Sequence, residues 1–145
     1  MKVYLAGPME GLTAEQMTKW REESKAYFRS YNENRGVHEK AILTLDPTDR
    51  TTFHEDSSLP HKLVYLDELD VRNADVILIN LSQMEELNLR CWGSICEMTL
   101  AHHLGKPVVM VLPKGRENHP FVQVYCTEIH SDLDSALKGV LGYTR

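Results

Sequence analysis

Two short apolar runs, residues 75–81 (DVILINL) and 107–113 (PVVMVLP), constrain the fold more than any other feature of this sequence. A strand with one face in water alternates apolar and polar residues, whereas these runs are apolar almost throughout. Strands of that kind are buried on both faces, which is typical of parallel sheets covered by helices on each side. The two runs therefore predict an α/β architecture.

Further strands and helices alternate with these runs. Apolar segments predict strands over residues 2–7 (KVYLAG) and 41–47 (AILTLDP), and an edge strand over 121–127 (FVQVYCT). Helical periodicity or capping signals predict helices over 12–32, 59–74, 94–107 and 131–141, the first opened by a capping box of Thr13 and Gln16 and the last capped by Ser131. The polar stretch 48–58 has loop composition and is long enough to be functional.

This alternation predicts one doubly wound domain over residues 1–145, flavodoxin-like or Rossmann-like, with a five-stranded and mainly parallel sheet. The length of 145 residues suits a single domain. We see no repeat, linker or low-complexity tract that would divide it.

Composition excludes several function classes. The net charge of -5 and the scattered Lys and Arg residues argue against a nucleic-acid polymer as partner. No signal segment or membrane-spanning stretch is evident, so we expect a cytoplasmic protein that does not enter a membrane. The three cysteines Cys91, Cys96 and Cys126 are expected to be reduced, and because the Cys and His residues lack ligand spacing we expect neither a metal nor a cofactor.

In a doubly wound sheet, ligands bind beyond the carboxyl ends of the strands. The chain is glycine-bearing or polar at these points. The turn after the first strand, AGPMEG, lets the backbone approach a ligand closely, although neither the Rossmann nor the Walker glycine spacing is present. The substrate-binding candidates from this argument are Gly7, Pro8, Met9, Asp46, Gly93 and Ser94, with Asp-Pro turn chemistry as the structural alternative for Asp46.

Ser94 and Glu97 allow two interpretations. Ser-x-x-Glu before an apolar run is the signature of a capping box, which would give both residues a purely structural role. The same glutamate lies at the ligand-binding edge of the predicted sheet, where it could act as a catalytic nucleophile. Spacing alone does not choose between the two.

The segments YLAGPM, DELDVRNADVILINL and GSICEMTLAHHLGKPVVMV together resemble the nucleoside 2-deoxyribosyltransferase family and the related nucleoside 5′-monophosphate N-glycosidases. The resemblance covers most of the chain except residues 30–62. It implies that Glu97 attacks the anomeric carbon, that Tyr4 hydrogen-bonds this carboxylate, and that Asp67 contacts the nucleobase. A strand aromatic and a solvated helix residue are the structural alternatives for Tyr4 and Asp67.

The resemblance also implies an assembly. Asn118 and Phe121 fall where the family contributes residues across a subunit interface, so a homo-oligomer of two or more subunits is expected. The chain departs from the family at Cys91, where the family has an aspartate that contacts the sugar.

The expected activity is cleavage of an N-glycosidic bond, with transfer of a 2-deoxyribosyl group to another free nucleobase through a glycosyl ester on Glu97. Asp67 is the candidate acid for the leaving base. Two alternatives stay open: hydrolysis of a nucleoside 5′-monophosphate to free base and sugar phosphate, and a non-catalytic nucleotide-binding module. In each case the partner is a nucleoside or nucleotide, with a free nucleobase where there is transfer.

Overall fold

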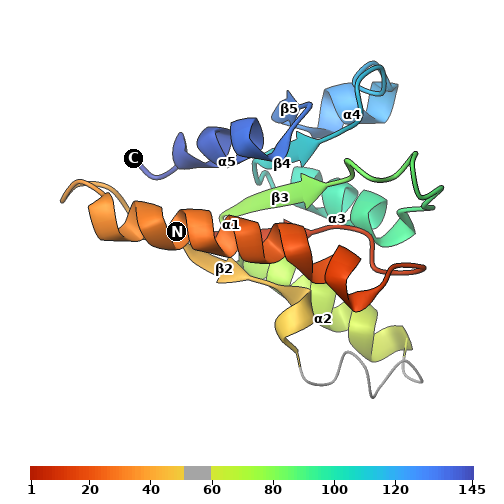
Figure 1. The fold of residues 1–145 in the computed structure, drawn as a ribbon, viewed down its shortest axis with the longest axis horizontal. Coiled ribbons are helices and arrows are strands. Elements are labelled where there is room, and N and C mark those ends of the chain that lie inside the picture. The colour runs from red at the N-terminus through yellow and green to blue at the C-terminus, as the bar shows by residue number, and fades with distance from the viewer. Residues whose placement is uncertain (51–59) are drawn as a thin grey trace.

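Five parallel strands form the centre of the structure, a computed structural model that describes residues 1–50 and 60–145 (Figure 1). The strands lie in the order β2-β1-β3-β4-β5, which is a doubly wound order, as the sequence predicted. The chain reverses its winding direction next to β1, so a crevice is expected at the carboxyl ends of β1 and β3. The bounds are β1 Lys2–Ala6, β2 Leu43–Leu45, β3 Val76–Asn80, β4 Val108–Val111 and β5 Glu128–His130.

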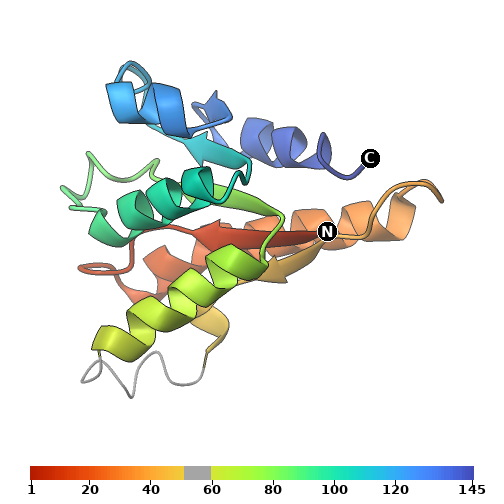
Figure 2. The ribbon, with the colours of Figure 1, turned by 180° about the vertical axis from the view of Figure 1, so that it is seen from behind.

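Helices cover both faces of the sheet, as Figures 1 and 2 show from opposite sides. One face packs against α1 (Ala14–Asn34) and α5 (Leu133–Leu141), with Val3 and Leu5 of β1 in that core. The other face packs against α2 (Pro60–Asn73), α3 (Trp92–His103) and α4 (Pro120–Tyr125). Because side chains alternate along a strand, Tyr4 belongs to this second face.

The predicted strand over 121–127 is wrong. Residues Pro120–Tyr125 form helix α4, and the fifth strand is the next segment, Glu128–His130. Proline favours the first turn of a helix, where its missing N–H is not needed. Phe121 and Val124 are 57% and 63% exposed, so the apolar residues of this segment do not form a strand buried on both faces.

The predicted helix cap is confirmed at α1 and is wrong at α5. The Thr13 hydroxyl accepts the Gln16 N–H at 3.2 Å, and the Gln16 side chain accepts the Thr13 N–H at 2.9 Å, which confirms the capping box. The predicted cap of α5 was Ser131, but the cap is Asp132, whose carboxylate accepts the Ser135 N–H at 2.8 Å.

The predicted loop 48–58 lies largely outside the described residues. Its start forms the short 3₁₀ helix η1, Pro47–Asp49, which follows β2.

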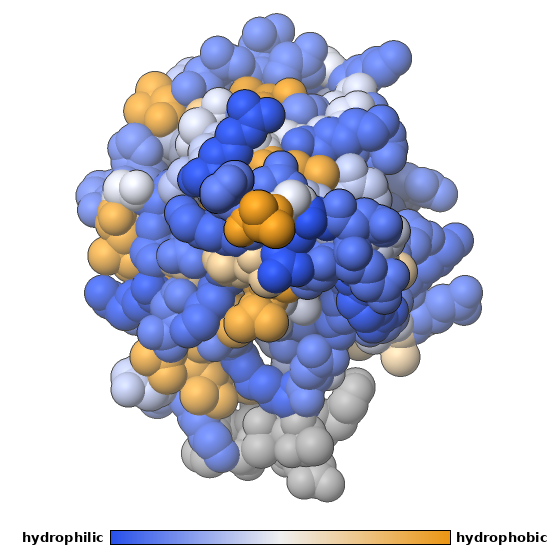
Figure 3. Space-filling model, turned by 90° about the vertical axis from the view of Figure 1, so that its left-hand side faces the viewer, coloured by the Kyte–Doolittle hydropathy of each residue, from blue (hydrophilic) through white to orange (hydrophobic). Residues whose placement is uncertain are grey.

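None of the helices in the described ranges is long and apolar enough to cross a lipid bilayer. Figure 3 views the molecule from the side of its C-terminus and the carboxyl end of α1. This surface is mainly hydrophilic, with hydrophobic residues in small scattered groups.

Candidate active site

Tyr4 and Glu97 meet at the crevice that the strand order creates. Tyr4 belongs to β1 and is fully buried, whereas Glu97 projects from the second turn of α3 and is partly buried. The Tyr4 hydroxyl donates a hydrogen bond of 2.6 Å to Glu97 Oε1. This bond orients the carboxylate through one of its two oxygens.

The environment makes Glu97 a weak acid. Burial raises the pKa of Glu97 to about 7, the Tyr4 hydrogen bond opposes this rise, and the charge of Asp67 adds to it. Burial and the charge of Glu97 raise the pKa of Tyr4 well above its usual value, so its hydroxyl stays protonated and donates. A carboxylate poised near neutrality in a crevice is typical of catalytic sites.

Asp67 approaches from α2 and is held by Arg50, the residue after η1. Arg50 Nη1 donates to Asp67 Oδ1 at 2.8 Å, while Nη2 contacts the carboxylate of Asp70 and, at 3.3 Å, the carbonyl of Leu66. Burial raises the pKa of Asp67, and Arg50 opposes the rise. This residue is therefore an anchored carboxyl group, as an acid for the leaving base would need to be.

The start of α3 rules out the capping box at Ser94. The helix begins at Trp92 after Cys91, and the Ile95 N–H donates to the Cys91 carbonyl at 3.1 Å. Ser94 is thus the third residue of the helix and is buried against the crevice. The carboxylate of Glu97 accepts from Tyr4 instead of closing a capping box, so the structural interpretation of this motif is wrong.

A cleft of about 500 Å³ opens in front of Glu97. Two rim residues, Asn88 and Cys91, have left-handed backbone conformations with φ of 50° and 53°. Such conformations cost on the order of 1 kcal/mol for a residue other than glycine and cluster at functional sites. The lining consists of residues 7–11, Asp67, residues 87–94 and Glu97.

The structure brings most of the sequence-predicted site residues together. Asp67, Glu97, Gly7, Pro8, Met9, Gly93 and Ser94 all line the cleft, and Tyr4 reaches it through Glu97. Asn118 and Phe121 lie elsewhere, exposed at the start of α4, so their proposed entry into a neighbouring subunit's site stays a prediction.

Asp46, expected to contact the substrate, is not among the cleft-lining residues in the described part of the chain, so its contact with the substrate stays a prediction. Its carboxylate is buried, lies 3.4 Å from Arg21 Nε and 2.7 Å from Lys25 Nζ, and accepts from the Thr48 N–H at 2.8 Å. The bond from Thr48 caps η1, as the Asp-Pro turn interpretation expects.

Sequence reasoning missed two arginines, Arg21 and Arg50. The signal for Arg21 was present, because it lies in helical register with Met17, Ser24 and Phe28, the buried stripe of α1. No local pattern marks Arg50, whose partner Asp67 is 17 positions away. Trp92, 69% exposed, and Arg90 also line the cleft and were not singled out.

One acidic cluster among the described residues has metal-ligand geometry: Glu22, Asp46 and Asp49. The Lys25 ammonium lies among them, at 2.9 Å from Glu22 and 2.7 Å from each aspartate. These hydrogen bonds raise the pKa of Lys25 although its burial opposes them. The lysine therefore already supplies the positive charge that this cluster needs.

Two solved structures share this fold over nearly the whole chain. A 2-deoxyribosyltransferase from the psychrotolerant bacterium Bacillus psychrosaccharolyticus superimposes with a TM-score of 0.63 and 15% identity, over 97% of this chain and 96% of that chain. The CMP N-glycosidase BcmB of Clostridium botulinum gives a TM-score of 0.59 and 13% identity, over 99% of each chain. No family model and no curated protein sequence matches this chain. The resemblance expected from the sequence is confirmed at the level of the fold.

Proposed function

We propose that this chain is an enzyme that cleaves the N-glycosidic bond of a (deoxy)nucleoside and transfers the 2-deoxyribosyl group to another nucleobase. The observation that carries the proposal is the Tyr4–Glu97 hydrogen bond of 2.6 Å at a cleft that also contains Asp67. The two proteins of the same fold, a 2-deoxyribosyltransferase and a CMP N-glycosidase, support this class of chemistry.

In the first step, an oxygen of ionised Glu97 attacks C1′ of the sugar. The C1′–N bond breaks, and its electron pair goes to the ring nitrogen of the leaving base, which takes a proton from Asp67. The product is a glycosyl ester on Glu97 and a free base. Tyr4 holds the other carboxylate oxygen and so restricts the orientation of the nucleophile.

In the second step, a ring nitrogen of a different base attacks C1′ of the ester. The bond from C1′ to the Glu97 oxygen breaks, the carboxylate leaves with the electron pair, and the incoming base returns its proton to Asp67. Water in place of the base would give hydrolysis. A cleft that the base fills favours transfer because it keeps bulk water from C1′.

The second candidate function is hydrolysis of a nucleoside 5′-monophosphate to base and sugar phosphate. It is favoured by Arg90 and by the first turn of α3, with Gly93 and Ser94, in the lining of the cleft. Backbone N–H groups at a helix N-terminus and a guanidinium both bind phosphate. The same Glu97 chemistry would apply, with water as the acceptor.

The test compares wild type with Glu97→Gln on a panel of nucleosides and 5′-monophosphates, with and without a second free base. We expect wild type to release or exchange the base and Glu97→Gln to lose at least about 10³-fold in kcat. Glu86→Gln, an exposed glutamate in the loop before α3, is the matched control and should keep full activity. Intact mass spectrometry of acid-quenched wild type should detect the glycosyl ester.

The possible outcomes separate the candidates. Base exchange identifies the transferase, and release of base from a monophosphate alone identifies the N-glycosidase. Ligand-dependent stabilisation of wild type without turnover would instead indicate a nucleotide-binding module and refute both.

We also propose a homo-oligomer in which Asn118 and Phe121 reach a neighbouring subunit's cleft. Both side chains are exposed, with the Phe121 ring packed against His119 and Tyr125 of its own chain. Sedimentation of the wild type as a monomer at assay concentrations would contradict this.

A further inference from the structure

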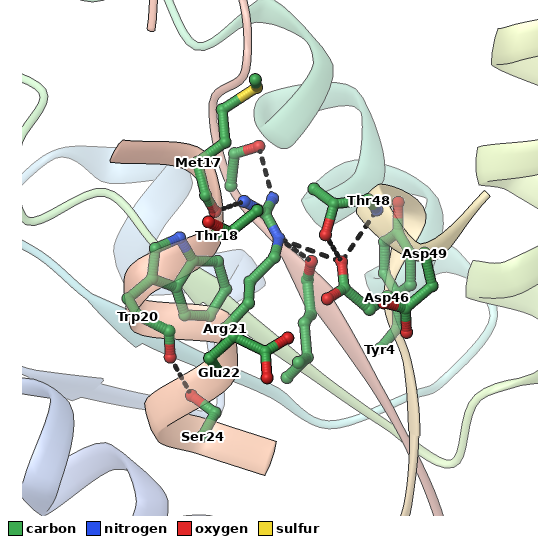
Figure 4. A network of polar contacts seen from close by, with 12 residues as sticks. Tyr4, Met17, Thr18, Trp20, Arg21, Glu22, Ser24, Asp46, Thr48 and Asp49 are labelled. Carbon is green, nitrogen blue, oxygen red and sulfur yellow. Dashed lines mark hydrogen bonds and ion pairs between the residues drawn. The ribbon is translucent and has the colours of Figure 1, made fainter. Parts of the chain in front are cut away.

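Arg21 is a buried cation with an unusual set of partners. Its side chain is fully buried on α1, and its guanidinium donates to the carbonyls of Leu5 at 3.3 Å and Gly7 at 3.1 Å, and to that of Met17. Figure 4 shows the side chain reaching from α1 toward Asp46. Buried arginines normally have a carboxylate partner, and here most of the donors go to backbone carbonyls instead.

The sheet explains why those carbonyls need a partner. The Met1 carbonyl accepts from Leu43 of β2, whereas the Lys2 carbonyl accepts from Asp75 next to β3, so odd-numbered carbonyls of β1 point toward β2. The pairing with β2 ends at Tyr4 and Leu45. The Leu5 and Gly7 carbonyls therefore extend past the last residue of β2, and Arg21 replaces the missing strand.

This arrangement places a positive charge behind the residues of the active site. Arg21 binds the carbonyls of Leu5 and Gly7, on either side of Ala6. These residues connect Tyr4 of β1 to the cleft loop, residues 7–11, which lines the cleft. Its charge lowers the pKa of both Glu97 and Asp67. The carboxylate of Asp46, 3.4 Å from Arg21 Nε, carries the opposite charge and is itself paired with Lys25 at 2.7 Å. Among the described residues, Tyr4, Asp67 and Arg50 also act on Glu97.

We infer that Arg21 is a positioning residue: it terminates the β1 ladder in place of β2 and sets a buried positive charge behind the strand end that carries Tyr4 and the cleft residue Gly7. This inference rests on the proposed role of Glu97 as nucleophile. It adds a counter-charge that lies outside the cleft lining, on the helix that covers the opposite face of the sheet.

The test follows the titration of Glu97 directly by ¹³C NMR of glutamate-labelled protein, with the resonance assigned by its loss in Glu97→Gln. Arg21→Gln removes the charge, so the titration midpoint of Glu97 should rise. Asp46→Asn removes the offsetting negative charge, so the midpoint should fall. Both variants break the same buried ion pair, so a structural disturbance would move the midpoint in the same direction in both.

Lys19→Gln is the matched control, because it removes one positive charge from an exposed position of α1. Its midpoint should equal that of wild type. Opposite shifts in Arg21→Gln and Asp46→Asn support the inference, and any other pattern overturns it. If Arg21→Gln does not fold, the Asp46→Asn variant decides alone. A lower titration midpoint of Glu97 in that variant supports the inference, and an unchanged or higher midpoint overturns it. Because no substrate is used, this outcome is independent of whether the proposed reaction occurs.

Discussion

Tyr4 and Glu97 are 93 positions apart in the sequence and are joined by one hydrogen bond of 2.6 Å, from the phenol to the carboxylate. The bond links the central part of the sheet to the helix that carries the proposed nucleophile. It is charge-assisted when Glu97 is ionised, and such bonds are about twice as strong as neutral ones. The protonation of Glu97 therefore depends on a residue of β1.

Tyr4→Phe should raise the pKa of Glu97 above about 7, because the hydrogen bond that favours the ionised form is lost. If the pKa of Glu97 rises by one unit, the ionised fraction of Glu97 at pH 7 falls from about half to about a tenth. We expect activity at pH 7 to fall accordingly, and one limb of the pH–rate profile to move to higher pH. Tyr27→Phe, a tyrosine remote from the cleft, should leave the profile in place. An unchanged profile in Tyr4→Phe would show that the bond does not tune Glu97.

Glu97→Gln should stabilise the fold at neutral and alkaline pH. The folded state raises the pKa of Glu97 from 4.5 to about 7, so it binds a proton that the unfolded chain has already lost in this range. Wild-type stability therefore decreases through this group as pH rises from 4.5 to 7. Above pH 7 we expect the variant to be more stable by about 3 kcal/mol, with no difference below pH 4.5. Urea unfolding at pH 4 and pH 8 measures this, and equal differences at both values would contradict it.

Arg50→Gln should shift the whole pH–rate profile to higher pH. Arg50 lowers the pKa of Asp67 and of Glu97, so both groups hold their protons to higher pH when it is removed. The loss of two partly buried ion pairs should cost about 1 kcal/mol in unfolding free energy. Arg72→Gln, an exposed arginine in the last turn of α2, is the control and should shift nothing. If only one limb of the pH–rate profile moves in Arg50→Gln, then Arg50 acts on only one of the two carboxyl groups.

Gly7→Ala and Gly93→Ala should change stability in opposite directions. A Cβ at Gly7 would lie 2.9 Å from Trp20 Cζ2 and 3.2 Å from the Asn80 carbonyl, so we expect a loss of about 1–3 kcal/mol. A Cβ at Gly93 would meet nothing within 4 Å, and alanine in a helix gains up to about 1 kcal/mol over glycine. Thermal unfolding of both variants checks this. A stable Gly7→Ala would show that the cleft loop can move away from Trp20.

The parts of the fold that could be predicted from sequence are those with a strong buried pattern. The runs in residues 75–81 and 107–113 became β3 and β4, because full burial leaves few alternatives for an apolar segment of that length. The prediction of a strand over residues 121–127 was wrong because a short apolar segment is compatible with either a strand or a helix. The exposure of Phe121 and Val124 is decided by tertiary packing, which the local sequence does not show.

The residues of the candidate site also divide into those that a sequence pattern predicts and those that depend on tertiary contacts. Positions after strands placed Gly7, Gly93 and Ser94 at the cleft, since the edge of a parallel sheet follows from strand order alone, whereas the role of Glu97 came from the family resemblance and stays a prediction. The true start of α3 depends on Cys91 adopting a left-handed conformation, which is rare for a cysteine and invisible in the sequence. The helical register of α1 marks Arg21 as buried, but its carbonyl partners and the Arg50–Asp67 pair are contacts between elements distant in sequence, which local patterns do not indicate.

The central position of β1 has a consequence for when this molecule becomes functional. β1 is the first strand of the chain, yet its partners β2 and β3 are formed by residues 43–45 and 76–80, and the carboxylate that its tyrosine holds is residue 97. Such long-range pairings form late because their loop-closure entropy must be overcome first. β1 is synthesised before all of its partners and is thus among the last elements to find its place, and a growing or truncated chain that ends before α3 cannot assemble the pair that the proposed chemistry requires.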